Sequence, residues 1–178
     1  MKIELKNIYF SERMSEETNC FSADVYVDGK KFLEAKNNGH GGCTDYHIHP
    51  SLYKNGKYPD DFREKLEALE EHCKALPPIM YHKTSLPMNL EFKIDILFDD
   101  WLKAKEEVKA QKTIAKKMQL GIVSGTLDRY TTTTWGKLTI PELLARPDGV
   151  AVLKKKVADL KANGISILNT NLPKEIMG

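Results

Sequence analysis

The chain has 178 residues, of which 41% are hydrophobic and 29% are charged, and its formal net charge is +2. This length suits one domain and this apolar content can fill a core, so we expect a single domain over residues 1–178 and exclude global disorder. The near balance of charge predicts no general attraction to nucleic acid, which leaves only a local basic stripe as a source of it.

Targeting and redox signals place the chain in the cytoplasm. No apolar run reaches the roughly 18 residues of a transmembrane helix, and residues 1–6 alternate polar and apolar instead of forming the apolar core of a signal peptide. Cys20, Cys43 and Cys73 are odd in number and widely spaced, which does not fit a disulfide framework. We therefore expect a cytoplasmic protein in a reducing compartment.

The N-terminal third predicts β-structure. Residues 2–10 alternate polar and apolar with a phase slip near Asn7, which is typical of a strand. Two β-prone runs, residues 21–27 and 30–35, flank Asp28-Gly29, a dipeptide that favours a type I′ turn because both central residues need a positive φ. We predict a β-hairpin there, and loops over residues 11–19 and 51–59.

Two helices are expected next. Residues 60–76 carry apolar side chains at 4-3-4-3 spacing, and Pro77-Pro78 ends this helix. The longest helix is predicted over about residues 89–118. Alternation of Leu90, Phe92 and Ile94 also allows a short strand first, but we prefer helix because the 3.6-residue period continues unbroken.

The C-terminal third mixes both element types. Residues 120–127 predict a buried strand, and residues 130–135 an edge strand or a substrate-facing loop. Thr139 and Glu142 form a capping box for a short helix, and Asp148 is expected to cap a last helix that stops at Asn163-Gly164. Residues 165–168 then predict a final strand. The fold class is therefore α+β: a mostly antiparallel sheet with the N-terminal β-hairpin, packed on one face by helices.

Histidine and cysteine crowd into residues 40–49, beside glycines. The candidate ligands are His40, Cys43, His47 and His49, and the glycines are Gly39, Gly41 and Gly42. Imidazole nitrogen and thiolate sulfur are the ligands that zinc prefers, so the group predicts a zinc site, although its spacing matches no standard zinc pattern.

Two other interpretations of this loop stay open. In the catalytic one, His40, Cys43 and His47 supply a thiolate nucleophile or an acid–base pair, and the amides of the glycine run cradle a phosphate, which suits a nucleotide substrate. In the structural one, the glycines form a tight turn, Cys43 packs as a small hydrophobic residue, and the histidines bind backbone groups. An exposed loop of this kind also presents Gly39, Gly41 and Gly42 to a partner.

Two further features suggest partner binding. Lys105, Lys109, Lys112 and Lys116 share one face of the long helix, where they could follow a phosphate backbone; the alternative is a solvated helix face. Arg129, Tyr130 and Trp135 surround a threonine run and could stack on a base; the alternative is an amphipathic edge strand.

The run Asn37-Asn38-Gly39-His40-Gly41-Gly42-Cys43, following the predicted hairpin, resembles a group of proteins from phages and gut bacteria without an established activity. The resemblance covers roughly residues 2–47, and it implies no functional residue.

From this context we expect a phage or mobile-element accessory protein, of anti-CRISPR or other counter-defence type, that binds a host defence protein or its nucleic-acid complex. The alternative is a small His/Cys-dependent enzyme, with or without zinc, that acts on a nucleotide or another phosphorylated substrate. No membrane partner is expected.

Overall fold

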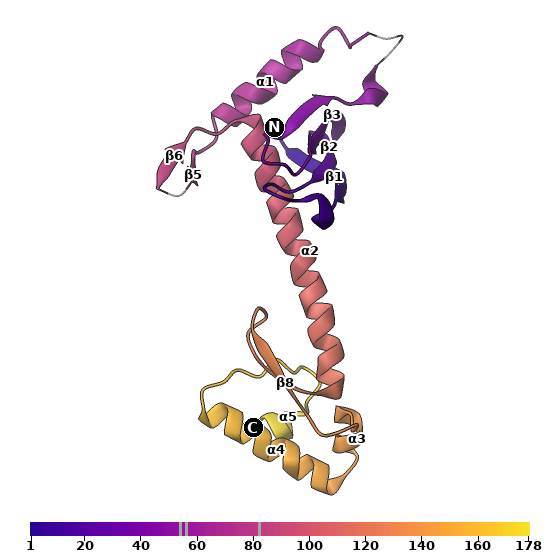
Figure 1. Cartoon of the computed structure of the whole chain (residues 1–178), viewed down its shortest axis with the longest axis vertical. Coiled ribbons are helices and arrows are strands. Elements are labelled where there is room, and N and C mark those ends of the chain that lie inside the picture. Colours follow the sequence, from indigo (N-terminus) through magenta and orange to yellow (C-terminus); the bar gives the residue numbers. More distant parts are fainter. Residues whose placement is uncertain (54, 56, 82) are drawn as a thin grey trace. The chain divides into compact units, whose positions relative to one another are not determined.

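The computed structural model describes residues 1–53, 55, 57–81 and 83–178. The chain divides into an N-terminal unit, Met1–Leu102, and a C-terminal unit, Lys103–Gly178, and each is described by itself. The long helix α2 (Leu90–Leu120) begins in the first unit and ends in the second (Figure 1). The single domain expected from length stays a prediction.

The N-terminal unit contains a four-stranded antiparallel sheet in the order β1-β2-β3-β4. Its strands are β1 (Ile3–Phe10), β2 (Phe21–Val27), β3 (Lys30–Asn37) and β4 (Asp45–Ile48). Asp28 and Gly29, between β2 and β3, have φ of 49° and 79°, which confirms the predicted hairpin turn. The register of β1 shifts between Lys6 and Tyr9, where the phase slip was expected.

One face of this sheet carries the core of the unit. Val25, Leu33 and Ala35 are fully buried there, together with Leu69 and Cys73 of α1 (Phe62–Lys74). The first turns of α2 add Leu90, Ile94 and Phe98, and the ring of Phe98 stacks on Phe21 with centroids 4.0 Å apart. Burying such a phenylalanine contributes about 2–3 kcal/mol, so these contacts set the positions of both helices against the sheet.

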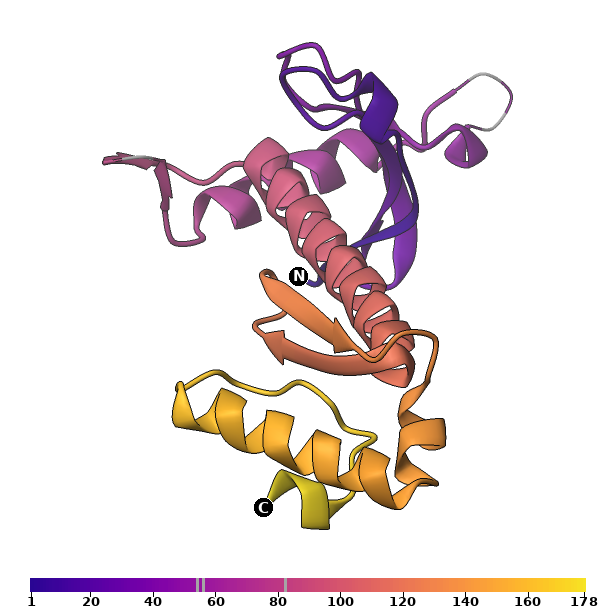
Figure 2. The ribbon, with the colours of Figure 1, turned by 60° about the horizontal axis from the view of Figure 1, so that its bottom comes forward.

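A second, two-stranded sheet joins α1 to α2. It consists of β5 (Ile79–Tyr81) and β6 (Thr84–Leu86), and Figures 1 and 2 show it extending away from the four-stranded sheet. The sequence did not predict it, because three-residue strands show too little alternation to be recognised. The predicted loop 51–59 contains the 3₁₀ turn Pro50–Leu52 at its start, while Lys54 and Gly56 lie outside the described residues.

The C-terminal unit packs helices around a hairpin of β7 (Gly121–Gly125) and β8 (Tyr130–Thr134). The helices are α3 (Ile140–Leu144), α4 (Pro147–Ala162) and α5 (Lys174–Met177). Ile122, Ile140 and Leu153 are fully buried in the shared core. Figure 2 shows the hairpin and α4 side by side. Residues 130–135 are thus largely an edge strand, one of the two predicted alternatives.

Of the predicted helix-end residues in this unit, some were confirmed and one was wrong. Thr139 forms the predicted capping box, with its backbone N–H donating to Glu142 Oε2 at 2.7 Å. The prediction for the last helix was wrong in detail, because Arg146 is the N-cap of α4 and Asp148 lies in its first turn, ion-paired to Arg146. Gly164, with φ of 67°, follows the end of α4 as expected.

Residues 165–168 were predicted as a final strand, which is wrong. They form one isolated bridge, between Ile167 and Ser124, and no strand. The physical reason lies at Asn169, whose side chain accepts the backbone N–H of Val123 at 2.6 Å and so takes the place of a further ladder partner. Among the described residues, no helix is long and apolar enough to cross a membrane.

Candidate functional site

Asn37 organises the glycine-rich loop, residues 38–44, that joins β3 to β4. Its side chain is buried, and its Oδ1 accepts hydrogen bonds from Thr18 Oγ1 at 2.8 Å and from the backbone N–H of Gly39 at 2.9 Å. Its Nδ2 donates to the Gly42 carbonyl at 3.1 Å and to Thr44 Oγ1 at 3.2 Å. The amide therefore makes all four hydrogen bonds open to it, which holds the loop in one conformation.

The glycines of this loop differ in what they do. Gly39 has φ of 86°, and a Cβ there would lie 2.1 Å from the Met14 carbonyl oxygen. The Gly39 carbonyl accepts three backbone N–H groups, those of residues 16, 17 and 18, at 2.9, 3.0 and 3.3 Å. The Gly41 N–H donates to Thr18 Oγ1 at 3.3 Å, whereas a Cβ on Gly42 would meet nothing within 4 Å. The amides of Gly39 and Gly41 are thus bound inside the protein and do not point at a phosphate.

His40 and Cys43 both lie on the surface, in acidic surroundings. His40 Nδ1 is 3.1 Å from Glu16 Oε2, and both side chains are more than half exposed. The negative charge of Glu91, a hydrogen bond to it, and the charges of Asp45 and Asp95 raise the pKa of the Cys43 thiol. A raised pKa disfavours the thiolate, so these surroundings act against the nucleophile that the catalytic interpretation needs.

Thr44 fastens the end of the loop to α2. It is buried, its backbone N–H donates to Glu91 Oε1 at 3.2 Å, and its hydroxyl donates to Asp95 Oδ1 at 2.6 Å. Burial raises the pKa of Asp95, the hydrogen bond from Thr44 opposes this, and the charges of Glu91 and Asp99 add to it. The loop is therefore bordered by carboxylates, which would repel a phosphate or nucleotide.

His47 and His49 lie on the sheet face opposite the core, but they have different neighbours. His47 is exposed and stands opposite Glu34 in the β3–β4 register. His49 is largely buried: its Nε2 is 3.0 Å from Asp24 Oδ1 and its Nδ1 is 2.7 Å from Ser51 Oγ. The extended geometry predicted to point both rings to one face is confirmed, yet the rings do not converge on one site.

The structure does not bring the four predicted metal ligands together. Within the described residues, no three His, Cys, Asp or Glu side chains are grouped so that they could hold a metal ion. His40 is paired with Glu16, Cys43 with Glu91, and His49 with Asp24. A zinc ion bound by His40, Cys43, His47 and His49 would require these pairs to separate and the loop to move away from α2.

Asp24 is a polar centre that the sequence did not reveal. Besides contacting His49, its Oδ2 forms an ion pair with Lys31 Nζ at 2.8 Å and accepts a hydrogen bond from Asn7 Nδ2 at 2.6 Å. Burial raises the pKa of this carboxyl, but the hydrogen bonds from Lys31 and Asn7 outweigh it, so the pKa is lowered. Its partners come from three other segments of chain, and only the alternation of β2 indicated that Asp24 faces away from the core.

The lysine face of α2 consists of Lys105, Lys109, Lys112 and Lys116. With Val108 and Thr113 these side chains line a shallow groove of about 420 Å³, and no carboxylate of the described part of the chain lines it. Ile114 is buried, and helical geometry puts it on the opposite side of α2 from this face. The predicted 4-3-4 spacing thus produces a continuous basic surface within the C-terminal unit.

The two aromatic residues predicted to stack on bases, Tyr130 and Trp135, make contacts within the protein instead. Lys117 Nζ lies 5.0 Å above the ring centroid of Tyr130. Trp135 packs against the core of the C-terminal unit. Arg129 is exposed at the turn between β7 and β8, where its backbone N–H donates to Thr126 Oγ1. Of the three, only Arg129 presents its side chain freely to a partner.

Charge is divided unequally between the two units. The N-terminal unit holds 13 Lys and Arg against 18 Asp and Glu, a net charge of −5. The C-terminal unit holds 14 Lys and Arg against 7 Asp and Glu, a net charge of +7. The whole-chain value of +2 therefore hides one acidic and one strongly basic unit.

Comparison with known proteins adds no relative: no protein-family model, no curated protein and no solved structure matches this chain.

Proposed function

We propose that this protein acts by binding, and that its C-terminal unit contacts the phosphate backbone of a double-stranded nucleic acid through the lysine face of α2. The supporting observation is the groove lined by four lysines and by no carboxylate, in a unit with a net charge of +7. Lysine contacts with phosphates release counterions, and this release supplies most of the affinity of sequence-independent binding.

The dimensions of the lysine face suit a polyanion. From Lys105 to Lys116 the helix rises about 16 Å, because each residue adds 1.5 Å. One strand of a duplex carries about five phosphates over that length. Ammonium groups at this spacing can reach different phosphates of one strand, which a single anion such as a nucleotide could not exploit.

The aromatic residues support a duplex rather than a single strand as the ligand. Proteins that bind single strands stack successive bases on exposed aromatic rings. Here Lys117 makes a cation–π contact with the ring of Tyr130, and Trp135 is partly buried against the core. We therefore expect contacts to the nucleic-acid backbone instead of base stacking. Arg129, at the turn between β7 and β8, would add a further cation to these contacts.

The resemblance of residues 2–47 to phage and gut-bacterial proteins leads us to propose a biological setting. In it, the protein is a phage or mobile-element accessory factor of counter-defence type, such as an anti-CRISPR protein, and its target is a nucleic-acid complex of the host. The negative charge of the N-terminal unit opposes nucleic-acid binding there, so this unit is available to a host protein.

The enzymatic alternative has less support. His40, Cys43 and His47 are separated, the Cys43 thiol has a raised pKa, and carboxylates border the loop. Each observation opposes a thiolate nucleophile or a bound phosphate. Replacing Cys43 by serine is therefore expected to leave the function of the protein unchanged.

The direct test measures binding of the whole protein to a fluorescent 30-base-pair duplex of arbitrary sequence by anisotropy, between about 50 and 200 mM KCl. The test variant carries Gln at Lys105, Lys109, Lys112 and Lys116, because glutamine keeps helix propensity. The matched control carries Gln at four other lysines of the same unit: Lys137, Lys154, Lys155 and Lys156.

We expect the test variant to lose more than tenfold in affinity and its salt slope to fall by about 3.6, near 0.9 for each of the four phosphate contacts removed. The control should lose less than about threefold, the effect of a change in long-range charge alone. Equal losses in the two variants, or no binding by the wild type at 50 mM KCl, would rule the lysine face out. A single-stranded oligonucleotide that binds tenfold more tightly than the duplex would contradict backbone binding of a duplex.

A further inference from the structure

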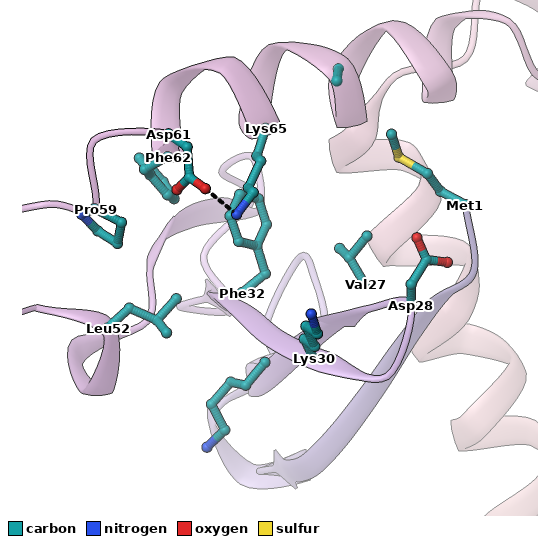
Figure 3. A pocket seen from close by; sticks show the side chains of 12 residues that line it. Met1, Val27, Asp28, Lys30, Phe32, Leu52, Pro59, Asp61, Phe62 and Lys65 are labelled. Atoms are coloured by element: carbon teal, nitrogen blue, oxygen red, sulfur yellow. Dashed lines mark ion pairs between the residues drawn. The ribbon is translucent and has the colours of Figure 1, made fainter.

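A pocket of about 550 Å³ lies in the N-terminal unit, between the β2–β3 hairpin, the Pro50–Leu52 turn and α1 (Figure 3). Its apolar lining includes Val27, Phe32, Leu52, Pro59, Phe62 and Ala68. The rings of Phe32 and Phe62 are 5.2 Å apart and form one wall. This volume and this lining are typical of a small-molecule site, in which apolar surface provides affinity and a few polar groups fix orientation.

The charged side chains that line this pocket are three lysines, Lys30, Lys31 and Lys65, and two aspartates, Asp28 and Asp61. Figure 3 shows Lys65, from α1, and Lys30, from β3, on opposite sides of the pocket. Lys65 is ion-paired to Asp61, and Asp28 accepts the backbone N–H of Lys2 at 2.8 Å. Among the described residues, Lys30 makes no ion pair, so its charge is available to a ligand.

Lys31 also lines the pocket, but its ammonium group is directed elsewhere. It donates to Asp24 Oδ2 at 2.8 Å on the sheet face opposite the core, so it contributes its aliphatic chain to the pocket. The pocket therefore combines an apolar interior with a rim on which Lys30 has no ion pair among the described residues, in a unit whose overall charge is −5. A local positive charge against that background is a specific recognition feature.

We infer that this pocket binds a small amphipathic anion, namely a carboxylate carried on an apolar body of about ten carbon atoms. The apolar body lies against Phe32, Phe62 and Leu52, and the carboxylate pairs with Lys30, while Lys65, ion-paired to Asp61, adds a second cation on the other side of the pocket. A nucleotide fits less well, because the pocket offers its base few groups for hydrogen bonding.

The experiment uses NMR chemical-shift titration of the ¹⁵N-labelled whole protein. The probes are sodium decanoate, decyltrimethylammonium, which has the same chain and the opposite charge, and AMP. Decanoate is expected to bind with a Kd between roughly 10 µM and 1 mM, as suits its size, and the other two at least tenfold more weakly.

Two pocket variants, each with a control variant, locate the site. Replacing Lys30 and Lys65 together by Gln should weaken decanoate binding by about tenfold, whereas Lys36→Gln, on β3 outside the pocket, should not. Ala68→Trp fills the pocket and should abolish binding, whereas Ala158→Trp, on the exposed side of α4, should leave it intact. All five side chains replaced in the pocket variants and their controls are exposed, so folding should be preserved, as circular dichroism can check.

Two results would overturn the inference. The first is that decanoate does not bind the wild type, or that it binds the Ala68→Trp variant as tightly as the wild type. The second is that decyltrimethylammonium or AMP binds as tightly as decanoate. Tight binding of decyltrimethylammonium would contradict the role of the lysines, and tight binding of AMP would contradict the role of the apolar interior. The duplex-binding test uses a different unit and different variants, so the two proposals can fail separately.

Discussion

The two units of this protein differ in charge but share a way of fastening a loop. The N-terminal unit has a net charge of −5 and the C-terminal unit +7. In each, a buried asparagine bonds backbone groups that secondary structure leaves open: Asn37 in the first unit and Asn169 in the second. Similar structural chemistry therefore supports surfaces of opposite charge in the two units. Because the units differ at the surface, the function is to be sought there.

The largest expected effect breaks the loop of the acidic unit. Gly39→Ala should destabilise the protein by roughly 3 kcal/mol or more, because the residue has a positive φ and its new Cβ would meet the Met14 carbonyl oxygen. Gly42→Ala is the matched control and should change stability by less than about 1 kcal/mol. Urea unfolding measures both, and equal midpoints would contradict the structural role assigned to Gly39.

The next effect tests the corresponding residue of the basic unit. Asn169→Leu removes the acceptor of the Val123 N–H and the donor to the Gly121 carbonyl, and so leaves two buried backbone groups unpaired. We expect a loss of about 2–4 kcal/mol in the free energy of unfolding. Asn163→Leu, at the exposed end of α4, should cost about 1 kcal/mol or less. Similar losses in both variants would show that Asn169 has no special role.

A smaller effect depends on pH. The folded protein raises the pKa of Asp95, mainly by burial, so it binds that proton more tightly than the unfolded chain does. The wild type therefore loses stability as the pH rises from the ordinary aspartate range through the raised value. Asn cannot ionise, so Asp95→Asn should gain stability relative to the wild type over that interval and keep the gain at pH 7.

The pH effect is measured by urea unfolding at several pH values. Asp100→Asn, an exposed position on α2, is the control and should follow the wild type throughout. A stability difference between Asp95→Asn and the wild type that stays constant from pH 3 to pH 7 would contradict the raised pKa.

The smallest effect concerns the exposed histidine of the loop. Among the residues that the structure describes, His40 pairs with Glu16 alone, and both side chains are more than half exposed. Such pairs contribute little, so His40→Ala should change the free energy of unfolding by less than about 0.5 kcal/mol. It should also leave duplex binding unchanged, because the loop lies in the acidic unit. A clear loss of stability or of duplex binding would show that His40 has a functional or structural role.

Much of the fold could be predicted from short-range signals. The Asp28-Gly29 turn, the capping box at Thr139 and the continuous helical period of α2 each depend on residues close together in the chain. Where prediction failed, a pairing partner outside the segment itself decided the outcome. Asn169 changed the pairing of residues 165–168, and three-residue strands such as β5 and β6 depend on each other rather than on their own pattern.

The candidate site shows the same division. By itself, the sequence determined the α+β class, the hairpin, the spacing of the four lysines and the clustering of His40, Cys43, His47 and His49 within ten residues. Only the tertiary structure decided what those side chains meet: Glu16, Glu91 and Asp24 come from other segments and separate the four ligands. The reason is physical, since turns and helix faces follow from local dihedral angles, whereas hydrogen bonds and pKa values follow from whichever charges folding brings near.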